Sequence, residues 1–315
     1  MLNKIINKLQ FSRAMLGLCL KCCFATFLVA CSESATSSDS SEQKHYLWKV
    51  SDENSSVWLL GSIHVADASF YPLAPVIDSA FSTASELAVE TLVDEDEYQW
   101  LLYKYGLLPT GTLRDVLPTD LWNSLDSLCM AWNLDVLTFE RRRPWVVATT
   151  ISSYAYIRAG LKGEYGIEYV FKSNAAKSGK PIVALETAEE QIAALGGTTD
   201  SVGVFYLKST MRELSGIESL IEKLIRAWKS GDDELLNRLL NENNTEGYSP
   251  LELQYLEEMN DRLLVKRNAK MADSIATFLR DDRNVFVVVG TAHLAFDQNN
   301  VIEILRNRGF VVERF

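Results

Sequence analysis

Short apolar runs separated by turns predict six β-strands, most of which lie towards the two ends of the folded part. They cover residues 46–50, 56–61, 86–90, 182–186, 285–289 and 310–314. The run at 285–289 is apolar at every position, which is typical of a central strand covered on both faces. The polar residues 52–55 form a turn signal between the first two strands.

Between these strands the apolar residues recur at helical spacing. From 201 to about 279 the pattern predicts helices only, including a long helix over 252–280. The chain is therefore expected to be an α/β protein, with a central mixed sheet built from N- and C-terminal strands and a large all-helical insertion at about 201–280. This insertion should pack beside or over the cleft at the strand ends. Shorter helices are predicted over 75–84, 94–105, 119–132, 144–159, 166–178, 188–195 and 299–308.

The N-terminus has the pattern of a targeting segment and is set apart from the fold. Residues 1–31 are interpreted as a lipoprotein signal peptide, with a basic region, an apolar stretch at 22–30 and then Cys31. The stretch is shorter than the roughly 20 residues that span a bilayer. Leu28-Val29-Ala30-Cys31 resembles a bacterial lipobox, in which Cys31 becomes the lipid-modified first residue. The alternatives are an uncleaved anchor or a cytosolic start, and Met15 is a second candidate start.

Residues 32–44 are rich in serine and contain no large apolar residue, so they are expected to be a disordered tether. Residues 45–315 then form a single domain. Ser32 stands where an aspartate would favour retention in the inner membrane. The predicted location is the periplasmic side of a bacterial membrane, with the outer membrane favoured.

Cysteine usage and net charge narrow the classes of function. Four of the five cysteines precede the predicted body, which leaves Cys129 alone in it. An internal disulfide and a zinc–thiolate cluster are therefore excluded, and Cys129 is expected to be buried in a helix. The chain carries 31 basic and 42 acidic residues, which argues against nucleic acid as a partner. The same charge opposes binding to anionic membranes, so membrane contact is expected through the lipid only.

Two of the three histidines occur in the same pattern, Gly-x-x-His, directly after an apolar run. Gly61-Ser62-Ile63-His64 follows the second predicted strand, and Gly290-Thr291-Ala292-His293 follows the fifth. Imidazole is a common metal ligand and a frequent acid or base. Because open α/β sheets bind their ligands at strand ends, the repeat indicates one shared site. The alternative is that both are ordinary core or surface histidines.

Two carboxylates occupy similar positions, since Glu90 and Glu186 each end a predicted strand. With the two histidines they form a plausible site for Zn²⁺, Mn²⁺, Fe²⁺ or Co²⁺. Glu90 could instead be an exposed strand-end carboxylate, and Glu186 a cap for the following helix. Arg267 in the long helix could stabilise an oxyanion, or it could be a surface arginine.

An ordered set of short motifs resembles the TraB/GumN family, also called Tiki-like, over about residues 48–315. The first is Leu59-Leu60-Gly61-Ser62-Ile63-His64-Val65. The others are Ala88-Val89-Glu90, Arg143-Pro144-Trp145, Gly166-Ile167-Glu168, Gly179-Lys180-Pro181, Leu185-Glu186-Thr187-Ala188-Glu189-Glu190-Gln191, Arg267-Asn268 and Gly290-Thr291-Ala292-His293-Leu294.

The resemblance implies an α/β fold related to erythromycin esterases and haem-binding ChaN-like proteins. Animal members of the family resemble metal-dependent proteases that clip secreted ligands. The family often has an aspartate where this chain has Glu168, so no role is carried over to Glu168. The residues that match the family's motifs are His64, Glu90, Glu186, Arg267 and His293.

The resulting hypothesis is a lipid-anchored periplasmic hydrolase that depends on a divalent metal ion and cleaves a peptide or small-molecule substrate. His64, Glu90 and His293 would hold the metal. Glu186 would be a further ligand or the general base, and Arg267 would stabilise the developing oxyanion. Two alternatives remain open: a non-catalytic protein that binds a peptide, metal or haem in the same cleft, and a metal-free esterase-like hydrolase.

Overall fold

The computed structural model describes residues 44–315 apart from 198, 242–244 and 296–298. The predicted signal peptide 1–31 with Cys31, and all of the predicted tether except Lys44, therefore lie outside the described residues. Within the described part no helix is both long enough and apolar enough to cross a membrane.

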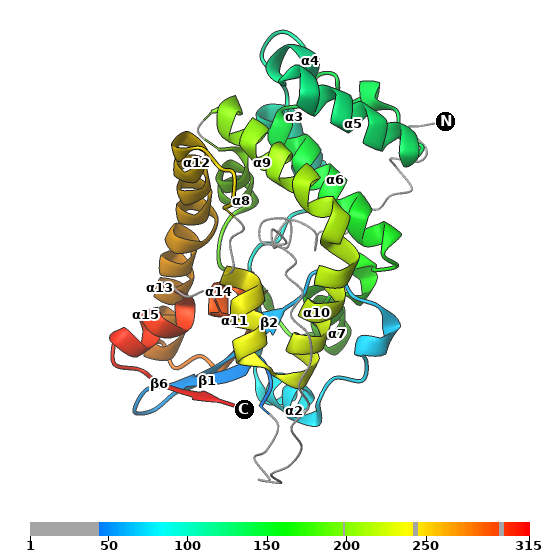
Figure 1. The fold of residues 1–315 in the computed structure, drawn as a ribbon. Helices are drawn as coiled ribbons and strands as arrows, with labels where there is room; N and C mark the ends of the chain where they lie inside the picture. Colours follow the sequence, from blue (N-terminus) through cyan, green and yellow to red (C-terminus); the bar gives the residue numbers. More distant parts are fainter. Residues whose placement is uncertain (1–43, 198, 242–244, 296–298) are drawn as a thin grey trace.

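A single mixed sheet forms one end of the molecule, as the sequence predicted (Figure 1). The strand order is β4-β3-β5-β2-β1-β6. The strands β4, β3, β5 and β2 run parallel, whereas β1 pairs antiparallel with both β2 and β6. The strands are β1 (Leu47–Ser51), β2 (Ser56–Ser62), β3 (Glu86–Val89), β4 (Ile182–Ala184), β5 (Val285–Gly290) and β6 (Val311–Arg314).

The apolar run of β5 lies at the centre of the sheet and is buried at all six positions. Its neighbours end close to where it ends, because Ser62 pairs with Gly290 and Val89 with Val288. The segments that follow β2, β3 and β5 therefore emerge side by side at one edge. β4 is shorter than predicted and ends at Ala184, so Glu186 lies beyond the strand.

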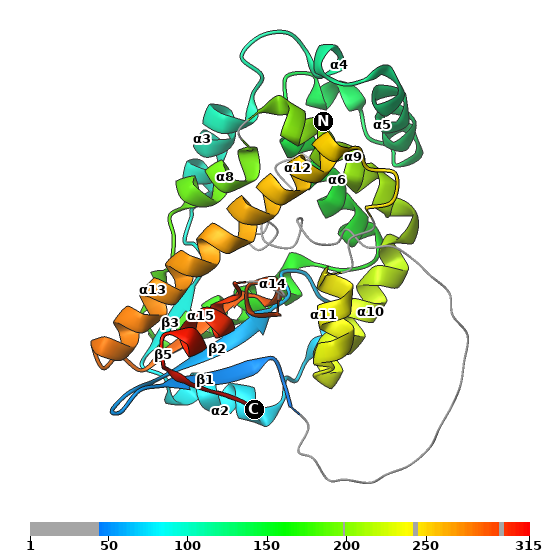
Figure 2. The same cartoon turned by 60° about the vertical axis from the view of Figure 1, so that its left-hand side comes forward.

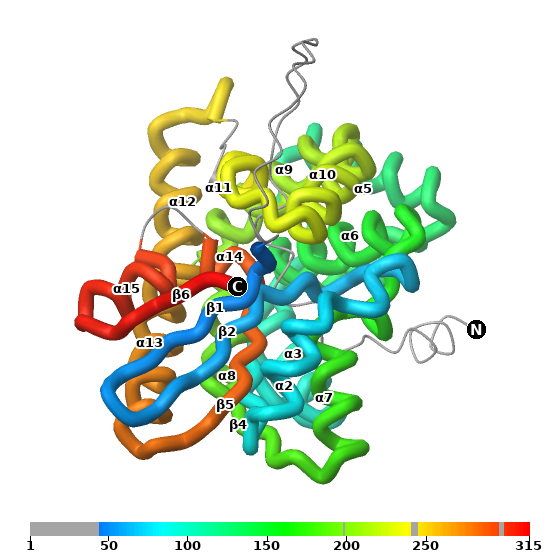
Figure 3. The backbone as a smooth tube through the Cα atoms, turned by 90° about the horizontal axis from the view of Figure 1, so that it is seen from below, coloured from blue at the N-terminus to red at the C-terminus, as the bar shows by residue number. Residues whose placement is uncertain are grey.

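Helices cover both faces of the sheet. Figure 3 shows α13 and α15 on one side and α2 and α7 on the other. Phe81 of α2 and Phe171 of α7 pack on Phe286 of β5, so aromatic contacts bind this layer to the central strand. The helices around the sheet are α2 (Pro75–Thr83), α7 (Ile167–Ser178), α10 (Ile217–Ser230), α11 (Asp233–Asn241), α13 (Lys266–Arg280), α14 (Thr291–Ala295) and α15 (Val301–Asn307).

A second core lies between helices on the far side of the sheet's carboxyl edge (Figure 2). It contains Cys129, which is a free, buried thiol as predicted. The helical part is larger than the predicted insertion, because helices before β4 pack with those after it. It comprises α3 (Glu95–Gly106), α4 (Leu113–Val116), α5 (Thr119–Ala131), α6 (Pro144–Arg158), α8 (Ala188–Gly196), α9 (Asp200–Glu213) and α12 (Pro250–Asn260).

The described part of residues 201–280 contains helices and no strand, as predicted, but the long helix expected over 252–280 is interrupted. α12 passes through a π-helical segment, Asp261–Val265, into α13. Leu263 lies in the helical core, whereas Met271 lies in the core around the sheet. The extra residue of a π turn changes the direction that the following side chains face. The continuous helical segment from α12 to α13 can therefore pack against both cores. Single-turn 3₁₀ helices occupy Ala68–Phe70, Val136–Phe139, Gly163–Tyr165 and Leu214–Gly216.

Helices α10 and α11 are amphipathic and pack over the carboxyl edge of the sheet (Figure 2). Gly231 joins them in the left-handed conformation, with a φ of 68°, which suits glycine. The indole of Trp228 donates a hydrogen bond of 2.9 Å to the carbonyl of Gly61 at the end of β2. This bond holds α10 above the strand ends.

Candidate functional site

The five residues predicted to form a site meet at the carboxyl edge of the sheet. His64 follows β2, Glu90 follows β3 and Glu186 follows β4. His293 lies in α14 directly after β5, and Arg267 reaches in from the start of α13. All are buried: Glu90 is 1 % exposed, and Arg267, the most exposed of the five, 8 %.

Glu90 is the centre of the cluster. Its Oε1 lies 3.9 Å from Nε2 of His64 and 3.8 Å from Nε2 of His293, so the two imidazoles flank one oxygen. The same oxygen accepts a hydrogen bond of 2.6 Å from the backbone of Gly290. Burial alone would raise the pKa of Glu90, but Arg267, the histidines and this amide outweigh it, so the pKa lies well below its usual value. The carboxyl is therefore an anion.

Gly290 leaves a space among these groups. A Cβ added to it would stand 3.1 Å from both Glu90 Oε1 and His64 Nε2, and 3.7 Å from the ring of His293. Any side chain at this position would occupy the point that the three groups face. The glycine of the second Gly-x-x-His pattern thus provides room inside the site.

The tautomer of His293 follows from its contacts. Its Nδ1 lies 2.6 Å from Oδ1 of Asn268, and the amide nitrogen of Asn268 donates to the carbonyl of Asn299. The amide is therefore oriented with its oxygen towards the ring, so Nδ1 must carry the proton. Nε2 is then the ring nitrogen that faces Glu90. Asn268 appeared in the sequence motifs, but only the folded structure reveals this contact.

His64 has a comparable neighbour in Glu168, to which the sequence assigned no role. Glu168 is buried, and its Oε2 lies 3.5 Å from Nδ1 of His64, while Lys172 binds its other oxygen. Neither ring nitrogen of His64 has a hydrogen-bond partner among the described residues. Burial lowers the pKa of His64, but the carboxylates of Glu168 and Glu90 outweigh burial and raise it.

A local signal could have identified Glu168. Gly166 packs so closely on the segment after β2 that a Cβ would lie 2.2 Å from the carbonyl oxygen of His64. The amide of Ile167 also donates to the carbonyl of Ile63. A glycine required for close backbone contact therefore places the acid two residues later beside the histidine.

Arg267 holds the two glutamates together. Its Nη2 contacts Glu90 Oε2 at 2.7 Å and Glu186 Oε1 at 2.5 Å, and its Nε donates to Glu186 Oε2 at 2.9 Å. Nη1 donates to the carbonyl of Leu263. Gln191 donates to both carboxylates at 3.2 Å. The guanidinium is thus engaged with Glu90 and Glu186, so the expected oxyanion role would require it to leave a glutamate.

Glu186 lies beside Glu90 because its backbone amide donates to the carbonyl of Glu90. Burial raises the pKa of Glu186, an effect that Arg267 opposes but does not cancel. The described contacts connect Glu186 to Arg267 and Gln191, and none connects it to either histidine. Thr187, rather than Glu186, caps the following helix.

The donor atoms are of the right kind for a divalent transition metal. Two imidazole nitrogens and one carboxylate oxygen are typical zinc ligands, and ligand atoms of a tetrahedral site lie about 3.3 Å apart. The distances of 3.8 and 3.9 Å are somewhat wider, and the described residues contain no closed cluster of three or more metal-binding side chains. The unpartnered Nε2 of His64 and the space beside Gly290 are the features of this centre that suit an ion.

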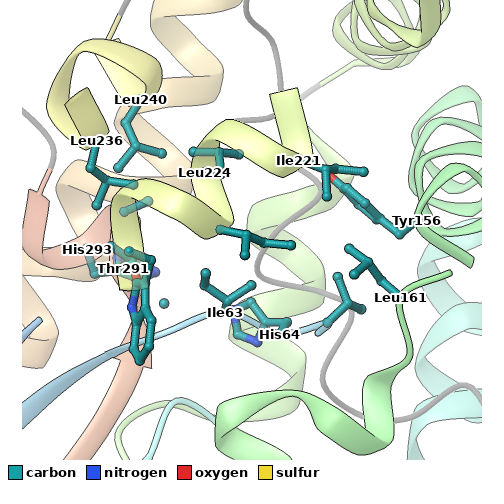
Figure 4. Close-up of a pocket in the computed structure, with 15 residues that line it drawn as sticks. Ile63, His64, Tyr156, Leu161, Ile221, Leu224, Leu236, Leu240, Thr291 and His293 are labelled. Atoms are coloured by element: carbon teal, nitrogen blue, oxygen red, sulfur yellow. The ribbon is translucent and has the colours of Figure 1, made fainter. Parts of the chain in front are cut away.

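A pocket connects this cluster with the space beneath α10 and α11. Both histidines and Thr291 line it together with mostly apolar side chains (Figure 4), and Gly290 is a further lining residue. The cavity has a volume of about 50 Å³ and is partly open. The site residues are almost fully buried. Among the described residues, this pocket is the cavity through which a ligand could reach the imidazoles.

The molecule thus belongs to the class of α/β proteins that carry a buried histidine–carboxylate centre at the carboxyl ends of parallel strands. A sequence model of the TraB/PrgY/gumN family matches residues 46–314, and the chain belongs to that family. The resemblance seen in the motifs is confirmed.

Two curated proteins are similar to this chain over most of its length. The uncharacterised protein YbaP of Escherichia coli (strain K12) is 24% identical over 266 residues, which cover 83% of this chain and 94% of YbaP. Metalloprotease TIKI2 of Danio rerio is also 24% identical, over 302 residues that cover 81% of this chain but 58% of TIKI2. No solved structure matches the chain.

Proposed function

We propose that this protein is a metal-dependent hydrolase that cleaves peptides. The observation that carries the proposal is the convergence of His64, Glu90 and His293 on the space beside Gly290. The similarity to a protein named as a metalloprotease supports it, because that similarity covers 81% of this chain.

In the proposal His64, Glu90 and His293 hold a divalent ion, of which zinc, manganese, cobalt and iron are the candidates. A bound ion of this kind polarises a carbonyl and lowers the pKa of its water from 15.7 to about 7. Asn268 and Glu168 orient the two imidazoles so that each Nε2 faces inward. Glu186 serves as a further ligand or as the base that accepts a proton from the attacking water.

Arg267 has a supporting role in this scheme. It balances the charge of Glu90 and Glu186 and keeps both carboxylates at the strand ends. During turnover one of its bonds to Glu186 would be exchanged for a bond to the developing oxyanion.

The proposal also includes a lipid anchor at Cys31, a residue that lies outside the described part of the chain. This anchor would hold the protein on the periplasmic side of the membrane.

Metal content and peptide cleavage test the proposal together. Purified full-length protein should contain one equivalent of metal and cleave a mixed peptide pool, and a chelator should abolish cleavage. His64→Ala and His293→Ala should lose both properties. His45→Ala is the matched control, because it removes the third histidine, which contacts the C-terminal strand instead of the site.

The burial of the site favours one alternative, a protein that binds a peptide without turnover. Both imidazoles are 2 % exposed, which limits the access of water. Tight peptide binding with full metal content and no cleavage would support this alternative. A haem is less suited to the same cleft, because about 50 Å³ is far smaller than the macrocycle.

A further inference from the structure

The pocket beside the histidines has a chemical character of its own. Its far wall consists of apolar side chains from one face of α10 and α11, namely Ile221, Leu224, Ile225, Trp228, Leu236 and Leu240. On the near wall, the hydroxyl of Thr291 is hydrogen-bonded to the carbonyl of Ser62. No Lys, Arg, Asp or Glu is among the described lining residues. Besides the hydroxyls of Thr291 and Tyr156, the imidazoles are therefore the polar side chains that an occupant would meet.

The pocket is larger than an ordinary packing defect. Protein interiors contain few voids larger than a water molecule, and one water requires about 15 Å³ on this scale. The cavity of about 50 Å³ is several times that size. Its apolar walls offer bridging water few hydrogen-bond partners, so apolar matter is the better occupant.

Size and position together define that occupant. An apolar cavity of about 150 Å³ admits benzene, and this one, at about 50 Å³, has a third of that volume. An aliphatic group of a few carbons fits, whereas an aromatic ring does not fit without movement of the walls. Because His64 and His293 line the same space, a side chain held there brings its own backbone to the site (Figure 4).

We propose that this pocket, formed by α10 and α11 over the two histidines, is the subsite that selects an aliphatic side chain next to the bond to be cleaved. The preferred peptides carry alanine, valine or leucine at that position. The proposal rests on the proposed peptidase function. It assigns the selection to α10 and α11, far in sequence from the residues that would hold the metal.

A peptide series tests this selection with purified full-length protein. The peptides are capped, identical except at one position, and carry glycine, alanine, valine, leucine, phenylalanine or lysine there. We expect kcat/KM for the leucine or valine peptide to exceed that for the glycine and lysine peptides at least tenfold. Most of the difference should lie in KM, since the pocket binds a group that does not react.

Two substitutions at Leu224 separate the subsite from the catalytic groups. Leu224→Trp fills the pocket and should remove the preference for leucine, so that kcat/KM for the leucine peptide falls at least tenfold relative to that for the glycine peptide. Leu224→Ala enlarges the pocket and should shift the preference towards phenylalanine. Leu251→Trp on α12 is the matched control, because Leu251 is 54 % exposed and lies outside the pocket. If Leu224→Trp does not fold, the shift in Leu224→Ala decides.

The outcomes for the subsite and for the hydrolase can be distinguished. Cleavage that ignores the varied side chain, or a preference that survives both Leu224 variants, overturns the subsite and leaves the hydrolase intact. If no peptide is cleaved, calorimetry on the same series decides. Binding of the leucine peptide that Leu224→Trp abolishes supports the subsite without the hydrolase, and equal binding of all peptides overturns it.

Discussion

At the scale of single residues, the site depends on one carboxylate between two imidazoles. Glu90 contacts His64, His293, Arg267 and the amide of Gly290 at once. Each neighbour favours its charged form, so the negative charge is stable in spite of burial. The carboxylate therefore supplies the charge that a divalent cation needs, and its substitution should affect metal binding before it affects the fold.

Glu90→Gln keeps the size of the side chain and removes that charge. We expect metal content to fall and peptide cleavage to drop at least 100-fold. The free energy of unfolding without metal should decrease by about 1–3 kcal/mol, since Arg267 retains Glu186 as its partner. Metal analysis, initial rates and denaturant unfolding measure the three effects.

Glu86→Gln is the control for this change, because Glu86 starts the same strand and binds Arg283 at its other end. Full metal content and full turnover in Glu90→Gln would show that Glu90 is a structural carboxylate. Glu186 would then replace Glu90 as the candidate carboxylate ligand of the metal.

Gly290→Ala places a methyl group in the space that the three donor groups face. We expect loss of bound metal and a drop in turnover of about 100-fold, because displacements near 1 Å at a reacting centre have effects of that size. Overpacking should lower the stability by about 1–3 kcal/mol. Metal analysis, rates and thermal unfolding report these effects.

Gly196→Ala offers the comparison, since a Cβ there meets Trp145 at an ordinary distance of 3.6 Å. It should leave metal content and turnover unchanged. A Gly290→Ala protein that binds metal and turns over like the parent would place the proposed site elsewhere.

At the scale of elements, the indole of Trp228 bonds α10 to the end of β2. Trp228→Phe keeps the aromatic packing and removes the donor to the carbonyl of Gly61. A buried carbonyl left without its partner costs about 1–3 kcal/mol, so the midpoint of urea unfolding should fall accordingly. Trp100→Phe, on an exposed residue of α3, should change the free energy of unfolding by less than about 0.5 kcal/mol. Equal effects of the two changes would mean that the indole bond contributes nothing to holding α10.

The elements also show how far periodicity can predict structure. The predicted strands and the helices around the sheet occur close to their expected bounds, because alternation and helical spacing record which face is buried. The break at Asp261–Val265 has no counterpart in that pattern. It arises because the rod from α12 to α13 packs on two cores that lie in different directions.

At the scale of the whole molecule, the proposed lipid anchor belongs to the N-terminal segment, outside the described residues. Cys31→Ser should abolish labelling by a fatty-acid probe and release the protein from the membrane fraction into the soluble periplasm. The reason is that the acyl chains on Cys31 would provide the membrane affinity, whereas the acidic body would be repelled by anionic lipids. Fractionation with immunodetection measures this, and Cys129→Ser serves as the control for loss of a cysteine. Unchanged membrane retention of Cys31→Ser would contradict the lipobox assignment.

The sequence by itself determined the class of fold and the identity of the five residues that gather at the strand ends. It could do so because parallel strands in one sheet bring their carboxyl ends to one edge, so His64, Glu90 and His293 were expected to meet there. Only the tertiary structure decided which atoms face each other. The contact of Glu168 with His64, the amide of Asn268 on His293 and the engagement of Arg267 by two glutamates all depend on how separate helices pack. The apolar pocket has the same origin, since α10 and α11 reach the histidines only when long-range packing places them over the sheet.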